Sequence, residues 1–200
     1  MKNTAITLAI KNCKLVLHDR ILPDATLLIC GERIAAFGGA DEVKIPDGVN
    51  VIDAAGGYVG PGFVDIHVHG GANVDFMGAT PEQVRAACVA HAKHGTTTIL
   101  PTTVTAKLDM TENMIRAVCQ AQAITTECTI AGVHLEGPFL SPKQAGAQDP
   151  EALIAPSEEV LDRLEKAWPG GIRIMGVAPE LPGGVAFGEV LARRGIRATI

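Results

Sequence analysis

From about residue 58 onward, short apolar runs alternate with longer amphipathic stretches, and this alternation constrains the fold more than any other feature. The apolar runs, interpreted as strands, are 62–68, 96–102, 128–137, 172–180 and 196–200. The amphipathic stretches, interpreted as helices, are 80–95, 108–123, 157–168 and 183–195. Repeated strand–helix units build a parallel sheet with helices outside. We therefore predict an α/β fold in which these units form about the first half of a (β/α)8 TIM-type barrel, since a whole barrel takes about 250 residues.

The first 57 residues follow a different pattern, in which short β-like runs are separated by turn residues and no helical period appears. This pattern predicts that residues 1–57 are part of a small β-sandwich domain, and that residues 58–200 are the first half of the barrel domain. A unit of this size buries too little surface to hold much core by itself. We expect it to pack against, or be completed by, other parts of the protein.

The composition excludes several classes of function. A net charge of −5 and a hydrophobic fraction of 47% describe a soluble, mildly acidic globular protein. Nucleic acid is not expected as a partner, because the chain has no basic run or basic–aromatic patch. No stretch approaches the roughly 20 apolar residues that a membrane span requires. The five cysteines are odd in number and scattered, which favours a reducing compartment, and we expect a cytoplasmic protein.

Two histidines at the end of the first predicted barrel strand are candidate metal ligands. His67 and His69 lie two residues apart, so their side chains leave the same face of the strand. They precede Gly70 at the carboxyl end of the strand, where barrel active sites are built. The alternative is a pair of barrel-interior histidines satisfied by hydrogen bonds. Asp65, on the same face, is expected to accept a hydrogen bond from an imidazole N–H.

A second candidate group lies at the end of the third predicted barrel strand. His134 and Glu136 share one face, and Gly137 and Pro138 are expected to turn the chain into a loop. A carboxylate at a strand end suits a cation such as Zn, Fe or Mn. The alternative for Glu136 is a solvated glutamate at the edge of a loop. Two strand ends thus direct His and Glu side chains toward one barrel mouth.

The remaining histidines and several large apolar residues are expected to have structural roles. We place His91 and His94 on the first barrel helix, away from the mouth, and His18 on the surface of the β unit. Helix packing is expected for two methionines and the tryptophan, namely Met110, Met114 and Trp168.

Three stretches of the chain resemble a known family. "VIDAAGGYVGPGFVDIHVHG" resembles the entry segment of the amidohydrolase superfamily, in which a small β-sandwich precedes a metal-dependent barrel. "HLEGPFLSPKQAGAQDP" closely resembles the signature of the N-acetylglucosamine-6-phosphate deacetylase family, and "HGTTTILPT" is similar to that family too. The resemblance covers about residues 15–200, which correspond to the N-terminal half of the family's usual length.

The resemblance implies a set of site residues. Glu136 would be a direct metal ligand, and His67 and His69 match positions that hold a second metal in some members. One or two divalent ions per subunit are implied, with Zn, Fe, Mn or Co as the metal. Ala147 and Gln148 match positions that contact the sugar, whereas the alternative for Gln148 is an ordinary polar loop residue.

The resemblance also implies groups that these 200 residues do not supply. The family's general-base aspartate, two further metal-binding histidines and most phosphate-binding residues are expected beyond Ile200. We therefore expect the 200-residue chain alone to be an incomplete enzyme.

The implied activity is the removal of the acetyl group from N-acetylglucosamine 6-phosphate, giving glucosamine 6-phosphate and acetate. The implied partners are this small phosphorylated amino sugar and, from the resemblance only, a second subunit in a homodimer. Two alternatives stay open. One is another amidohydrolase acting on a cyclic amide or a nucleobase, and the other is a non-catalytic fragment of the fold.

Overall fold

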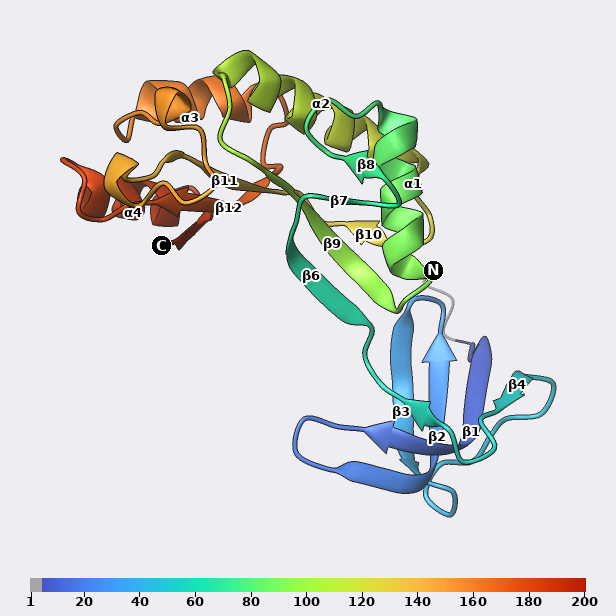
Figure 1. Cartoon of the computed structure of the whole chain (residues 1–200). Coiled ribbons are helices and arrows are strands. Elements are labelled where there is room, and N and C mark those ends of the chain that lie inside the picture. Colours follow the sequence, from blue (N-terminus) through green and yellow to red (C-terminus); the bar gives the residue numbers. More distant parts are fainter. Residues whose placement is uncertain (1–4) are drawn as a thin grey trace. The chain divides into compact units, whose positions relative to one another are not determined.

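The computed structural model describes residues 5–200, which divide into two compact units (Figure 1). The first unit ends at Pro61, and the second runs from Gly62 to Ile200. Every sequence-predicted site residue lies in the second unit. None of the helices within residues 5–200 combines the length and the apolar character that a membrane crossing requires.

The first unit is a five-stranded sheet. Its strands are β1 (Leu8–Val16), β2 (Ile21–Cys30), β3 (Arg33–Gly39), β4 (Asn50–Asp53) and β5 (Tyr58–Val59). The order is β3-β2-β1-β4, and β5 also pairs with β1. Because β5 belongs to this sheet, the unit ends at Pro61 and not at residue 57. Its membership of a β-sandwich domain stays a prediction.

The second unit is built on a parallel sheet, as the alternating pattern predicted. Its strands are β6 (Phe63–Val68), β9 (Thr96–Thr103), β10 (Thr129–Ile130), β11 (Val133–Phe139), β12 (Ile172–Val177) and β13 (Arg197–Thr199). β6 pairs with β9, and β9 is followed by β11, β12 and β13, while β10 lies beside the amino half of β9. All of these pairs are parallel, so the sheet is a half barrel in which neighbours in space follow one another along the chain.

The third barrel strand differs from the prediction in two ways. The run 128–137 is interrupted between β10 and β11 at Gly132, whose φ of +144° and contact with the Gly171 carbonyl leave no room for a Cβ. The strand then continues through Gly137 and Pro138 to Phe139, so the predicted turn at Gly137 was wrong. The β11–β12 register shifts between Leu135 and Phe139, and such an irregularity tolerates a proline, which has no N–H for the ladder.

Four helices follow the barrel strands, and α1, α2 and α3 lie on the same side of the sheet (Figure 1). They are α1 (Pro81–Ala92), α2 (Leu108–Ile124), α3 (Glu158–Glu165) and α4 (Gly184–Arg193). The hydroxyl of Thr80 accepts a hydrogen bond from the Gln83 N–H and forms a capping box at α1. The Ser157 hydroxyl accepts a hydrogen bond from the Val160 N–H at the start of α3. Buried residues of these helices and of β9, β11 and β12 form one core.

The packing predictions for the large apolar side chains were right for two of three residues. Met114 is buried in the core, and Trp168 packs against it. Met110 is 49% exposed, so its predicted packing role was wrong. Met110 lies in the first turn of α2, and the buried face of that helix begins at Thr111.

Within the second unit, shorter elements follow the strands at their carboxyl ends. A two-stranded hairpin, β7 (Gly70–Gly71) with β8 (Val74–Asp75), follows β6. Two short 3-10 turns, η1 (Pro142–Gln144) and η2 (Pro150–Ala152), follow β11.

Candidate metal centre

Three side chains, from β6, from the residue after it and from β11, converge at the carboxyl end of the sheet. Nε2 of His67 lies 3.2 Å from Nε2 of His69. Oε2 of Glu136 lies 3.4 Å from Nε2 of His67 and 3.1 Å from Nε2 of His69. Among residues 5–200, these three form the one group of three or more His, Cys, Asp or Glu side chains that could hold a metal ion.

The spacing of the three donor atoms fits a divalent cation. They form a triangle with edges of 3.1, 3.2 and 3.4 Å. Donor atoms about 2.0–2.1 Å from a tetrahedral ion lie about 3.3 Å apart, so this triangle has the size of one face of such a site. Two imidazoles and a carboxylate are also a donor set that zinc and similar ions take.

Thr102 orients His69, and the sequence did not reveal this role. The backbone carbonyl of Thr102 lies 3.3 Å from Nδ1 of His69. A carbonyl only accepts, so Nδ1 carries the proton and Nε2 keeps its lone pair for a cation. The Thr102 hydroxyl also accepts a hydrogen bond from the Val68 N–H at 3.0 Å. This side-chain bond lies beside Pro101, opposite Val68, where the β6–β9 register shifts.

Asp65 accepts a hydrogen bond, as expected, but the predicted donor was wrong. Oδ1 of Asp65 accepts a hydrogen bond from the backbone N–H of His67 at 3.2 Å, and not from an imidazole. An Asp side chain readily reaches the N–H two residues further on, because the chain between them is short. Asp65 therefore acts on the backbone that carries His67.

Two threonines hold the backbone at Glu136. The Glu136 N–H donates to the Thr103 hydroxyl at 3.1 Å, and the Glu136 carbonyl accepts from the Thr105 hydroxyl at 3.0 Å. Gly137 has a φ of +132°, and a Cβ there would collide with the Thr105 hydroxyl. The Glu136 side chain is 29% exposed and contacts both histidines, so it is not a solvated side chain at a loop edge.

The two residues expected to contact a sugar lie in the loop that follows β11. Ala147 is exposed, and Gln148 is buried. Oε1 of Gln148 accepts a hydrogen bond from the Thr105 N–H at 2.7 Å. Because this hydrogen bond holds the carbonyl oxygen, the NH2 group is the part of the Gln148 side chain that can donate to a ligand. Through Thr105, this loop is connected to the backbone of Glu136.

His134 lies beside the three-residue cluster but is not one of its members. Its side chain is buried, and its Nδ1 lies 2.9 Å from the carbonyl oxygen of Ile66. The His134 and His67 rings meet edge to face, with centroids 4.9 Å apart. Burial lowers the pKa of the His134 imidazole, and this effect outweighs the hydrogen bond to the Ile66 carbonyl, which raises the pKa. Its Nε2 is the one buried side-chain N or O atom without a hydrogen-bond partner among the described residues.

The expected surface position of His18 is confirmed, whereas His91 contacts the hairpin at the mouth and His94 lies beyond the end of α1, so their expected placements were wrong. Nε2 of His91, on α1, lies 2.9 Å from the carbonyl of Gly70 and so fixes the hairpin that follows His69. His94 is exposed just after the end of α1, and His18 is exposed in the first unit.

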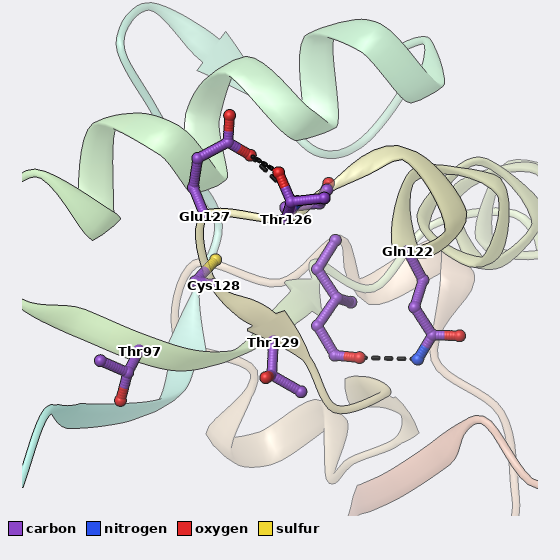
Figure 2. Close-up of a pocket in the computed structure, with 8 residues that line it drawn as sticks. Thr97, Gln122, Thr126, Glu127, Cys128 and Thr129 are labelled. Carbon is purple, nitrogen blue, oxygen red and sulfur yellow. Dashed lines mark hydrogen bonds between the residues drawn. The ribbon is translucent and has the colours of Figure 1, made fainter. Parts of the chain in front are cut away.

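A separate cavity lies at the opposite end of the barrel strands. It has a volume of about 360 Å³ and is lined by the residues that Figure 2 shows, including Thr97, Gln122, Cys128 and Thr129. Its one carboxylate, Glu127, is paired with Arg85, and its lining contains no histidine. The carboxyl ends of barrel strands form active sites, so we do not assign this cavity to the metal centre.

Comparisons with known proteins show the family of the chain. Residues 58–192 match the Amidohydrolase family. An N-acetylglucosamine-6-phosphate deacetylase of Lysinibacillus sphaericus is 32% identical over 154 residues, which are 76% of this chain and 40% of that protein. An N-acetylgalactosamine-6-phosphate deacetylase of Escherichia coli O157:H7 is 30% identical over 188 residues, which are 94% of this chain and 48% of that protein.

A solved structure agrees in fold as well as in sequence. It is a mutant N-acetyl-D-glucosamine-6-phosphate deacetylase from Mycobacterium smegmatis in complex with N-acetyl-D-glucosamine-6-phosphate. The TM-score is 0.79 at 28% identity, and the match covers 97% of this chain and 49% of that one. The chain thus spans less than half the length of these relatives. The resemblance of the sequence motifs to the N-acetylglucosamine-6-phosphate deacetylase family is confirmed.

Proposed function

This chain belongs to the amidohydrolase family, and on that premise we propose that it provides the metal-binding side of a deacetylase active site. The substrate is N-acetylglucosamine 6-phosphate, and the products are glucosamine 6-phosphate and acetate. The observation that carries the proposal is the convergence of His67, His69 and Glu136 at the carboxyl end of a parallel half barrel.

The residues that hold the cation are these three. His69 presents Nε2 because Thr102 takes its Nδ1 proton, and Glu136 supplies the anionic donor. A divalent cation bound there supplies Lewis-acid chemistry, which activates water and polarises the carbonyl of an amide. Zn, Fe, Mn or Co is the proposed metal, with one or two ions per subunit.

The amino-sugar substrate is supported by the names of the relatives and by the loop after β11. The Gln148 NH2 group, together with the backbone at Ala147, offers hydrogen-bond donors to the oxygens of a sugar. The net charge of −5 does not attract a phosphate, so local groups must bind it. We assign no general base within residues 5–200, because Glu136, the carboxylate of the cluster, is a metal ligand in this proposal.

Two further parts of the proposal concern the whole protein. We place it in the cytoplasm, in keeping with five cysteines that are odd in number and scattered along the sequence. We also propose a homodimer, which sedimentation of the whole protein tests.

The test of the activity uses the purified whole protein and three substrates. N-acetylglucosamine 6-phosphate should be deacetylated fastest. The second substrate is N-acetylgalactosamine 6-phosphate, because one relative is named as a deacetylase of that sugar. The third is a cyclic amide, which tests for ring opening. Chelation should abolish deacetylation, and added Zn²⁺ or Co²⁺ should restore it. Faster opening of the cyclic amide would favour the other amidohydrolase, and metal binding without hydrolysis of any substrate would favour a non-catalytic role.

A further inference from the structure

His134 stands next to the metal centre, and the proposed function gives it no role. It is carried by β11, two residues before Glu136, and its ring reaches the backbone of β6 beyond the intervening strand β9. We propose that His134 is a positioning residue, which holds His67 opposite Glu136 by binding the backbone of β6. This inference rests on the proposed metal site and deepens it.

The hydrogen bond from His134 fixes its own tautomer. The Ile66 carbonyl can only accept, so Nδ1 of His134 carries a proton and donates it over 2.9 Å. Ile66 directly precedes His67, so this bond holds the peptide from which the His67 side chain leaves the strand. The Asp65 carboxylate binds the N–H of His67, at the other end of that same peptide.

The ring of His134 also limits the orientation of the His67 imidazole. The two rings are at 80° to one another, with centroids 4.9 Å apart, in the edge-to-face arrangement that aromatic rings favour. In contrast to His69, whose Nδ1 is held by Thr102, His67 has no ring hydrogen bond outside the cluster among the described residues. Packing against His134 therefore orients the His67 ring, just as the hydrogen bond to Thr102 orients the His69 ring.

The unpartnered Nε2 distinguishes this role from ordinary core packing. A buried polar atom without a partner costs free energy that a leucine or phenylalanine at the same place would not. In His134 this cost is offset by the hydrogen bond that the other ring nitrogen, Nδ1, makes to the Ile66 carbonyl. The geometry thus gives Nδ1, and not Nε2, the functional contact of His134.

Three substitutions of His134 separate these contacts. His134→Asn places an amide N–H close to the position of Nδ1, and so keeps the donor to Ile66. His134→Gln places its amide near Nε2 instead, and His134→Leu removes both nitrogens. Gln122→Leu is the matched control, because it deletes the 2.7 Å hydrogen bond from a side chain to the Ile130 carbonyl of the same sheet, away from the metal centre (Figure 2).

The measurement is a titration of the metal-free whole protein with Co²⁺, followed by the visible absorption of the bound ion. We expect His134→Leu and His134→Gln to lose about 10-fold or more in Co²⁺ affinity, as removal of a partner of a metal ligand does. His134→Asn and Gln122→Leu should bind as the unaltered protein does. Urea unfolding of each variant shows whether a loss of affinity merely follows a loss of stability.

Three results would overturn the inference. Unchanged affinity in all three His134 variants would remove His134 from the metal site. A loss in His134→Asn equal to that in His134→Leu would show that the Nδ1 bond is not what matters, and an equal loss in Gln122→Leu would reduce the effect to stability. If the unaltered protein binds no Co²⁺, the proposed function itself fails, and the inference fails with it.

Discussion

Within the proposed metal site, Glu136 is the side chain on which we expect cation binding to depend most strongly. It is the one carboxylate of the cluster, and both histidines approach the same oxygen, Oε2. Glu136→Gln keeps the shape of the side chain and removes its charge, which leaves a cation without an anionic partner. We expect the affinity for Zn²⁺ to fall by about 10-fold or more, as measured by competition with a chromophoric chelator.

Glu159→Gln is the control for this experiment, because Glu159 is an exposed carboxylate in the first turn of α3. It should leave the affinity for Zn²⁺ unchanged. If Glu136→Gln retains both full metal content and full deacetylase activity, Glu136 is not a ligand.

The cysteines allow a second test at this scale. Burial is the main cause, and the nearby Cys128 the second, that raises the pKa of the Cys88 thiol to about 12. The thiolate is the reactive form, so Cys88 should not react with iodoacetamide at pH 8 in the folded protein, whereas the partly exposed Cys119 should. Mass spectrometry of the labelled peptides measures both. Labelling of Cys88 as fast as Cys119 would contradict the packing of α1, and guanidinium should make both react.

The sequence revealed the metal-binding candidates because a strand has a period of two residues. That period places His67 with His69, and His134 with Glu136, on shared faces. It could not reveal the contacts of Thr102 or His134, since their partners lie 33 and 68 residues away and depend on strand register. The alternation of side chains along one strand contains no information on register.

At the scale of elements, α1 is the helix that contacts the chain next to the proposed metal site. Its His91 binds the Gly70 carbonyl, directly after His69. The helix begins at a capping box, in which the Thr80 hydroxyl accepts from the Gln83 N–H. Thr80→Ala should reduce the free energy of unfolding by about 1 kcal/mol, as loss of an N-cap hydroxyl does. Urea denaturation measures the change.

Thr80→Ser keeps the hydroxyl and should restore most of this stability. The metal affinity of Thr80→Ala should be unchanged where the protein is folded, because the cap lies at the far end of α1 from His91. An equal loss of stability in the serine and alanine variants would show that the hydroxyl is not the source of the effect.

The bounds of helices and strands were predicted well where periodicity and capping residues define them. They were predicted less well where the backbone conformation of a single residue ends or interrupts a strand. Thr80 with Pro81, and Ser157 before two glutamates, marked the starts of α1 and α3 correctly. The run 128–137 was wrongly taken as a single strand, because the break depends on the φ of Gly132 and on the nearby Gly171 carbonyl. Neither is visible in an apolar pattern.

At the scale of the whole molecule, one sheet brings together residues that are far apart in the sequence. His67 and Glu136 are carried by strands separated by β9, and the parallel direction of all three places their carboxyl ends at the same edge. This shared direction was predictable from the repeated βα pattern. The end of the first unit at Pro61 was not, since it depends on the pairing of β5 with β1.

The position of a bound ion tests the central claim most directly. Crystals of the whole protein loaded with Zn²⁺ would be measured on both sides of the zinc absorption edge. We predict one anomalous peak within about 2.0–2.2 Å of Nε2 of His67, Nε2 of His69 and a carboxylate oxygen of Glu136. Zinc bound elsewhere, with these three side chains left in contact only with one another, would contradict the account.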